Sequence, residues 1–199
     1  MKRLLAIATT SLLIIGGLAG CAADYRAQAQ TDSKWVTLFN GVHANDWTPI
    51  GNANWRLQDG NLQGDVGAGF LVSKKSYKDF ELRAEFWADD DANSGIFIRC
   101  ADPLKVTADN SYEVNIFDKR PDPSYGTGAI VNYAKIDTMI KAGGKWNTFE
   151  ISAKGPVMTV TLNGVRTVEA RDAKFPSGPI ALQSAGGTIK FRKVEILPL

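Results

Sequence analysis

Hydrophobic and polar residues alternate along most of the chain after Trp35, and a period of two predicts β-strands. The clearest case is the stretch 80–87, in which Phe80, Leu82, Ala84 and Phe86 are expected to face inward. Shorter stretches with strand character follow the same rule, at 55–58, 61–63, 96–99, 112–117, 146–153, 157–162, 180–183 and 189–197. The pattern therefore predicts a chain built from many short strands.

Two dipeptides predict where neighbouring strands turn back on each other. Asp59-Gly60 and Asn163-Gly164 each separate two strand-like stretches, and such pairs favour two-residue hairpin turns. A sustained helical period is absent after the leader, and the best helical candidate is a turn or two within 135–141. Short strands with Gly-rich turns predict an all-β fold, a two-sheet antiparallel jelly-roll sandwich. The outer face of one sheet is then a candidate for a concave, ligand-binding surface.

The first 21 residues have the organisation of an export signal. Lys2 and Arg3 precede an apolar run, 4–15, which is too short for a comfortable transmembrane helix. The run closes in Leu18-Ala19-Gly20-Cys21, which matches the bacterial lipobox, whose cysteine is lipidated. The alternative is a simple secretory signal that is cleaved nearby, for instance after the sequence Ala27-Gln28-Ala29.

These features predict three parts of the chain. Residues 1–20 are expected to be a lipoprotein signal peptide, 21–33 the lipidated Cys21 with a polar tether, and 34–199 a single domain. The protein is therefore expected to be exported and anchored by lipid to the bacterial cell envelope. Ala22, where an Asp would favour inner-membrane retention, indicates the outer membrane if the cell is Gram-negative.

Charge and cysteine content narrow the function further. The chain has 23 Lys plus Arg and 21 Asp plus Glu, and loss of Lys2 and Arg3 with the leader leaves 21 of each. A near-neutral protein without a basic block is not expected to bind nucleic acid. With Cys21 lipidated, Cys100 has no partner for an internal disulfide and is expected to be a small buried hydrophobe.

Two other features offer weaker chemistry. The only histidine, His43, falls in an early loop and is expected to be an exposed surface residue rather than a general base. The acidic turn 89–93 could present oxygen ligands to calcium, but it lacks the EF-hand spacing, and a solvated loop is the favoured interpretation.

Two neighbouring predicted strands, 96–99 and 112–117, share an unusually polar face. Strand alternation places five side chains on that face: Phe97, Arg99, Glu113, Asn115 and Phe117. Gln183 lies opposite the core residue Leu182 on a later strand and could join them. This combination predicts the floor of a cleft for a polar ligand, although an ordinary Arg–Glu ion pair on a sheet surface remains the alternative.

An ordered set of short blocks resembles the 3-keto-disaccharide hydrolase domain family from about Trp35 to Leu197. The resemblance implies a concanavalin-like jelly roll and action on glycosides oxidised at C3. This chain departs from the family pattern in having Asn115 for Gln, and Ser184-Ala185 for Asp-His. The blocks are Leu38-Phe39-Asn40-Gly41, Asp79-Phe80-Glu81-Leu82, Asn93-Ser94-Gly95-Ile96-Phe97-Ile98-Arg99, Tyr112-Glu113-Val114, Thr127-Gly128-Ala129-Ile130, Leu162-Asn163-Gly164 and Gly178-Pro179-Ile180-Ala181-Leu182-Gln183.

The resemblance and the strand pattern together suggest roles for individual residues. A C3 ketone acidifies the C2 proton, so Glu113 could act as base or acid while Arg99, or a divalent metal such as calcium in its place, stabilises the enolate. A paired-carboxylate mechanism is disfavoured because Glu113 and Asp118 should face opposite ways. The residues expected to contact a sugar are Asn93, Asn115, Tyr133, Trp146 and Gln183.

Three functions remain open at this point. The first is an enzyme that cleaves 3-keto-glycosides or related glycosides by elimination and hydration. The second is a non-catalytic carbohydrate-binding module on the cell surface, which the Ser184-Ala185 departure favours. The third is a structural or protein-interaction lipoprotein.

Overall fold

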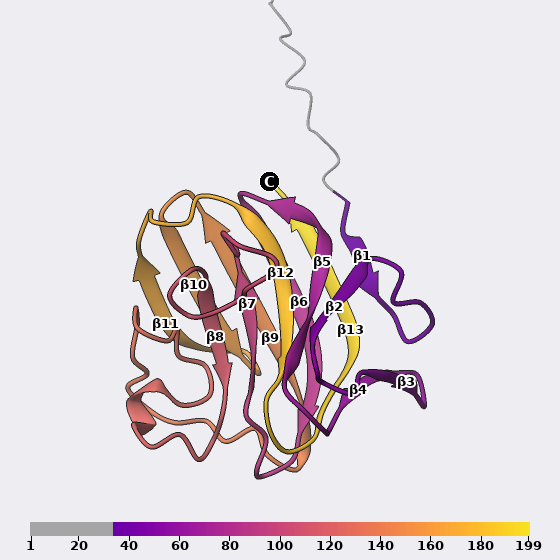
Figure 1. The fold of residues 1–199 in the computed structure, drawn as a ribbon. Helices are drawn as coiled ribbons and strands as arrows, with labels where there is room; N and C mark the ends of the chain where they lie inside the picture. The colour runs from indigo at the N-terminus through magenta and orange to yellow at the C-terminus, as the bar shows by residue number, and fades with distance from the viewer. Residues whose placement is uncertain (1–33) are drawn as a thin grey trace, which may run out of the picture. The chain divides into compact units, whose positions relative to one another are not determined.

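Two antiparallel sheets make up the computed structural model, which describes residues 34–199 (Figure 1). The expected signal peptide, the lipidated Cys21 and the tether lie outside the described residues. Within residues 34–199 no helix is long and apolar enough to cross a membrane. The two sheets confirm the predicted all-β sandwich.

The larger sheet has eight strands in the order β11-β10-β9-β6-β13-β4-β3, and β1 also pairs with β13. They are β1 (Val36–Phe39), β3 (Arg56–Gln58), β4 (Asn61–Gly64), β6 (Phe80–Ala88), β9 (Lys145–Lys154), β10 (Val157–Leu162), β11 (Val165–Arg171) and β13 (Ile189–Pro198).

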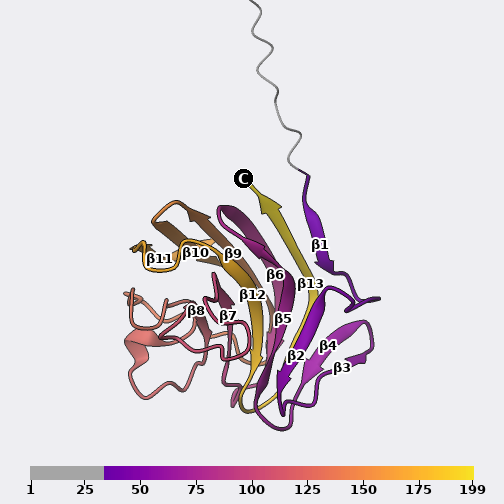
Figure 2. The same cartoon turned by 45° about the horizontal axis from the view of Figure 1, so that its top comes forward.

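The smaller sheet has five strands in the order β2-β5-β12-β7-β8. They are β2 (Trp47–Gly51), β5 (Gly69–Tyr77), β7 (Ser94–Ile98), β8 (Tyr112–Ile116) and β12 (Gly178–Ser184). Figure 2 shows β5 and β12 running side by side through this sheet, and the register of their pairing agrees. The late strand β12 thus lies between the early strands β5 and β7.

The core lies between the sheets and follows the predicted alternation. In β6, Phe80, Leu82, Ala84 and Phe86 are buried while the residues between them are half-buried, as expected. Phe86 stacks on Phe149 of β9 with ring centroids 4.9 Å apart. Large aromatic side chains bury much apolar surface, so the inward-facing residues of β6 and their contact with Phe149 contribute strongly to the stability of the fold.

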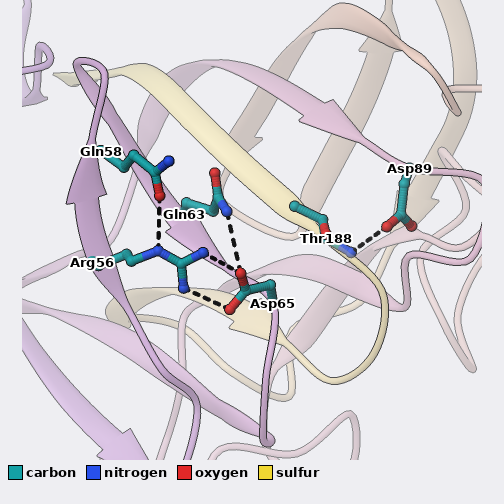
Figure 3. Close-up of polar contacts among 6 residues, drawn as sticks. All are labelled: Arg56, Gln58, Gln63, Asp65, Asp89 and Thr188. Atoms are coloured by element: carbon teal, nitrogen blue, oxygen red, sulfur yellow. Dashed lines mark hydrogen bonds and ion pairs between the residues drawn. The ribbon is translucent and has the colours of Figure 1, made fainter.

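Both predicted hairpin turns are present. Asp59 and Gly60 have φ angles of 51° and 71°, and Asn163 and Gly164 have φ angles of 51° and 82°. Two consecutive positive φ angles define the type I′ turn, whose twist matches that of the flanking strands. The β3–β4 hairpin continues into a polar cluster in which Arg56 forms a two-pronged ion pair with Asp65 (Figure 3).

The helical turn or two expected near residues 135–141 are not found. That stretch has no helical residue, and the one helical turn among the described residues is a 3₁₀ turn, Pro123–Tyr125. Ile136 is buried and its amide donates to the carbonyl of Ser124 at 2.9 Å. The loop is therefore fixed by a long-range contact that local helical propensity cannot compete with.

Candidate functional site

The outer face of the smaller sheet, which points away from the core, carries the candidate site. Phe97 of β7 lies opposite Glu113 of β8, and Gly95 lies opposite Asn115. Ala181 of β12 lies opposite Phe97 in turn. Because side chains alternate along each strand, these positions share one face, as the alternation predicts for Phe97, Glu113 and Asn115.

An apolar floor forms part of this face. The rings of Phe70 and Phe97 meet edge to face with centroids 5.2 Å apart. The other members of this cluster are Ile50, Val72, Cys100, Val106 and Ala181. The cluster is separate from the main core, so it provides a dry wall beside the polar groups of β8.

Glu113 is the unusual carboxyl on this face. Glu113 is only 7% exposed, and its carboxyl oxygens accept no hydrogen bond within residues 34–199. Burial raises the pKa of Glu113 to about 7, and the positive charge of Arg120 opposes that rise. A carboxyl that titrates near neutrality can exchange protons in either direction at physiological pH.

Arg120 is a residue that the strand pattern could not reveal, because it lies in the turn after β8. Its amide donates to the carbonyl of Phe117 at 3.4 Å, and its side chain forms no ion pair within the described part of the chain. The sequence shows only that Arg120 follows Glu113 and Asn115 by a few residues. Arg120 therefore supplies a free cation near the buried carboxyl.

Two amide side chains beside Glu113 have unused acceptors. Asn115 is fully buried and donates through Nδ2 to the carbonyl of Tyr125 at 2.6 Å, which fixes its orientation. Its Oδ1 atom has no partner, and Oε1 of Gln183 is also buried and unpaired. Buried polar atoms without partners are costly and uncommon. Both oxygens are therefore suited to accept hydroxyl groups of a bound ligand.

Asn93 and the Ser184-Ala185 pair lie where β7 and β12 end. Alternation places Asn93 on the same face as Gly95, and its carbonyl accepts from the amide of Ala185 at 3.0 Å. Ser184 points inward, since a Cβ atom on Gly64 would lie 2.8 Å from its hydroxyl. Ser184 and Ala185 therefore bring no ionisable group to the outer face.

The expected placement of Arg99 beside Glu113 is not found. Arg99 has a φ angle of +54°, so the chain leaves the extended conformation there and alternation no longer applies. Its guanidinium is 1% exposed and donates to the carbonyls of Lys78 and Gly155 and to the Asp79 carboxylate, at 2.8, 2.7 and 3.1 Å. These contacts join the connection between β5 and β6, which links the two sheets, to the β9–β10 turn of the larger sheet. Arg99 therefore has a structural environment and not a ligand-facing one.

Trp146 and Tyr133 are also placed elsewhere. Trp146 lies opposite Trp87 across β9 and β6, on the outer face of the larger sheet, with the Arg192 guanidinium 4.3 Å from its ring centre. Tyr133 packs edge to face on the core residue Tyr112 at 4.8 Å. Neither ring lies on the face that carries Glu113. Alternation along β9 does not show which sheet that strand joins, and Tyr133 lies in a turn, where alternation does not apply.

The acidic turn is occupied by contacts within the protein. Asp89 accepts from the amides of Thr188 and Asp91 at 2.7 and 3.0 Å, and Figure 3 shows the first of these contacts. Asp91 pairs with Lys119. Residues 34–199 contain no group of three or more His, Cys, Asp or Glu side chains that could hold a metal ion. The carboxylates of Asp89 and Asp91 therefore have partners within the protein.

The remaining sequence candidates are simpler. His43 is exposed in the loop between β1 and β2, and the structure places it apart from Glu113 on a different edge of the sandwich. Cys100 is buried, and burial raises the pKa of its thiol to about 12. Cys100 belongs to the apolar floor, as expected for a small hydrophobe.

Fold and site together define a jelly-roll β-sandwich with a polar site on one sheet face. The same fold is found in the carbohydrate binding module CBM66 from Bacillus subtilis, with a TM-score of 0.59, 21% identity, and coverage of 80% of this chain and 96% of that one. The sequence model of the 3-keto-alpha-glucoside-1,2-lyase-like domain matches residues 34–197. The chain belongs to this family.

Two relatives show how far the similarity extends. A 3-keto-disaccharide hydrolase from Bacteroides thetaiotaomicron is 26% identical over 158 residues, which cover 62% of this chain and 54% of that protein. The chain thus matches about half the length of that relative. A crystal structure from Parabacteroides distasonis, provisionally called a glycosyl hydrolase, has a TM-score of 0.72 and 28% identity, and covers 83% of this chain and all of that one.

Proposed function

We propose that this protein cleaves glycosides that carry a ketone at C3, with Glu113 as the group that removes and returns the C2 proton. The observation that carries the proposal is the juxtaposition of a buried, unpaired carboxyl with two unpaired amide oxygens, those of Asn115 and Gln183, on one sheet face. Family membership and the name of the Bacteroides relative support the substrate class.

The reaction proposed here is an elimination followed by hydration. The C3 carbonyl acidifies the C2–H bond, and Glu113 takes this proton to give an enolate. The C1–O bond then breaks, its electron pair leaves with the aglycone oxygen, and that oxygen takes up a proton. Water adds at C1 of the resulting enone and a proton returns to C2, so that the net change is hydrolysis.

Other residues of the face have positioning roles in this proposal. Asn115 and Gln183 accept hydrogen bonds from sugar hydroxyls, which fixes the ring above Glu113. Arg120, whose positive charge lowers the pKa of Glu113, is the candidate in place of Arg99 for the cation that stabilises the developing enolate. The Phe70–Phe97 pair supplies an apolar floor that excludes water from the reacting carbons.

The decisive experiment measures aglycone release from a chromogenic 3-keto-glucoside. Glu113→Gln is expected to lower kcat by about 10²–10⁴-fold, the usual contribution of a general base. Glu169→Gln serves as a matched control, because Glu169 lies on β11 and pairs with Arg166 at the surface. Equal activity of the native and Glu113→Gln proteins would exclude Glu113 as the base.

The elimination route has its own signature. In D₂O, recovered substrate or product should carry deuterium at C2, because the proton on Glu113 exchanges with solvent before it returns. Hydrolysis without any C2 deuterium would favour direct displacement at C1 and contradict the enolate.

A second function, carbohydrate binding without turnover, is favoured by one observation. Ser184 and Ala185 bring no ionisable group near Gln183, so they provide no second acid or base beside Glu113. Saturable binding of a 3-keto-glucoside by both the native protein and Glu113→Gln, with no aglycone release by either, would establish this alternative.

We also propose that the protein is a lipoprotein of the cell envelope, on the basis of the Leu18-Ala19-Gly20-Cys21 motif. The native chain should partition into the detergent phase of Triton X-114, and Cys21→Ser should move it to the aqueous phase. Equal partitioning of the two chains would contradict lipidation.

A further inference from the structure

A groove crosses the outer face of the larger sheet, on the side of the sandwich away from Glu113. Its volume is about 220 Å³, and its lining residues come mainly from β6, β9 and β10. These three strands are neighbours in the larger sheet (Figure 1). The pairing register builds two rows across these strands. One row is Glu81, Ser152 and Thr159, and the other is Arg83, Glu150 and Thr161. We call this the Trp35 groove, after the indole that forms its wall.

The wall is an exposed aromatic ring held by a cation. Trp35 is 37% exposed, and the Arg83 guanidinium lies 5.0 Å from its ring centre. Arg83 is itself fixed by Glu150, with Nη2 to Oε1 at 3.0 Å. A cation above an aromatic ring restrains the ring on that side, so an indole with exposed surface is preorganised beside the groove.

The floor of the groove is lined by hydroxyl groups. Ser152, Thr159 and Thr161 are half-buried, and their hydroxyls form no hydrogen bond within the described part of the chain. Their short side chains leave the space that longer residues fill elsewhere on this face. The floor therefore offers three donors and acceptors to a ligand that lies on it.

The charges around the groove are already paired. Arg83 pairs with Glu150 at 3.0 Å, Lys154 with Glu81 at 2.8 Å, and Arg166 with Glu169, on the neighbouring strand, at 3.1 Å. No excess of positive charge is left to hold a phosphate or an acidic sugar, and the hydroxyl floor does not suit an apolar chain. The chemistry of the groove thus matches an uncharged ligand rich in hydroxyls.

We propose that the Trp35 groove binds a neutral oligosaccharide, with one pyranose ring packed on the Trp35 indole and its hydroxyls on the Ser152, Thr159 and Thr161 floor. Two other tryptophans of this face, Trp87 and Trp146, also have a cation near the ring, at 4.8 Å and 4.3 Å from the ring centre. Trp35 differs from them because its ring lines the groove, whereas Trp87 and Trp146 are not among the residues that line it. The Trp35 groove lies on the other sheet from Glu113, so it is independent of the proposed reaction.

The test is a titration of the full chain, in detergent, with cellohexaose and with maltohexaose, followed by calorimetry. At least one hexasaccharide should bind, with a Kd on the order of 1 mM or below. Trp35→Ala should weaken that binding at least about tenfold, through loss of the stacking surface. Trp146→Ala is the matched control, because Trp146 has the same exposed fraction of 37% on the same face, and should change Kd less than about twofold.

A second variant keeps the proposal testable if Trp35→Ala does not fold. Thr159→Val with Thr161→Val removes two floor hydroxyls at nearly constant volume and should also weaken binding several-fold. The proposal is overturned if neither hexasaccharide binds, if Trp146→Ala weakens binding as much as Trp35→Ala, or if Glu113→Gln abolishes it. Trp35→Ala should cleave a 3-keto-glucoside at the native rate, so failure of the groove and failure of the Glu113 proposal give different results.

Discussion

Glu113 leans over Gly95: a Cβ atom on Gly95 would lie 3.3 Å from Cγ of Glu113 and 3.3 Å from Cε2 of Phe97. The same atom would lie 3.1 Å from the carbonyl oxygen of Val114. Gly95 therefore provides the space into which the buried carboxyl and the aromatic floor both pack. A glycine in the middle of a strand often marks such a close approach.

Gly95→Ala should consequently disturb the site more than the fold. The added methyl is expected to push the Glu113 carboxyl aside and lower kcat for a 3-keto-glucoside by about tenfold or more, since small displacements of a catalytic group are costly. Thermal unfolding should show a modest loss of stability. A variant with native kcat would show that the position of Glu113 is not critical for turnover.

The pH dependence of stability should report the burial of Glu113. Its pKa rises from 4.5 to about 7 in the folded protein, so between these values the folded state holds a proton that the unfolded state has lost. The stabilisation that the protonated Glu113 contributes is therefore fully present below pH 4.5. It is lost as the pH rises from 4.5 through about 7, and above that pH the contribution no longer changes. The rise corresponds to about 3 kcal/mol at about 1.4 kcal/mol per pH unit, as an upper bound.

Urea unfolding at pH 5 and pH 8 checks this expectation. Glu113→Gln should be more stable than the native protein at pH 8, and the two should converge toward pH 5. If Glu113 is the base, kcat should rise with pH up to about 7 and then level off. A stability difference that grows toward acid pH would contradict the burial of a raised-pKa carboxyl.

Arg99→Met tests the structural assignment of Arg99. The change leaves the carbonyls of Lys78 and Gly155 and the Asp79 carboxylate without their donor, and should cost about 3–5 kcal/mol of unfolding free energy, as for other broken buried pairs. Arg166→Met, at an exposed pair, is the control and should change stability little. If Arg99→Met had native stability but no turnover, Arg99 would instead have a role in catalysis.

Cys100 should be inert to thiol reagents in the folded protein. It is 2% exposed, and burial raises its pKa to about 12, so almost no thiolate is present at pH 8. With Cys21→Ser, which leaves Cys100 as the one thiol in the chain, Ellman's reagent should react only after unfolding in guanidinium. Rapid labelling of the native protein would show that loop 99–111 opens readily.

Much of the fold was readable because local rules agreed with the tertiary structure. Asp59-Gly60 and Asn163-Gly164 adopt positive φ angles at low cost, so these turns form wherever the flanking strands do. On the outer face of the smaller sheet, Glu113 and Asn115 were placed correctly because β8 is regular and alternation holds throughout it.

The misplaced site residues share physical causes. Arg99 sits at a left-handed backbone position that ends the alternation, and only the folded structure shows its three distant acceptors. Trp146 points outward as its strand requires, but the sheet to which β9 belongs is decided by pairing with β6, far away in sequence. Arg120 lies in a turn, where spacing carries no information about direction.

The two sheets of the sandwich turn their outer faces in opposite directions, with the core between them. The Trp35 groove lies on one of these faces and Glu113 on the other, so the two sites can be occupied by different molecules at the same time. A domain that binds a polymer through the Trp35 groove would stay at the polymer surface. Successive small glycosides could meanwhile bind to and leave the face that carries Glu113.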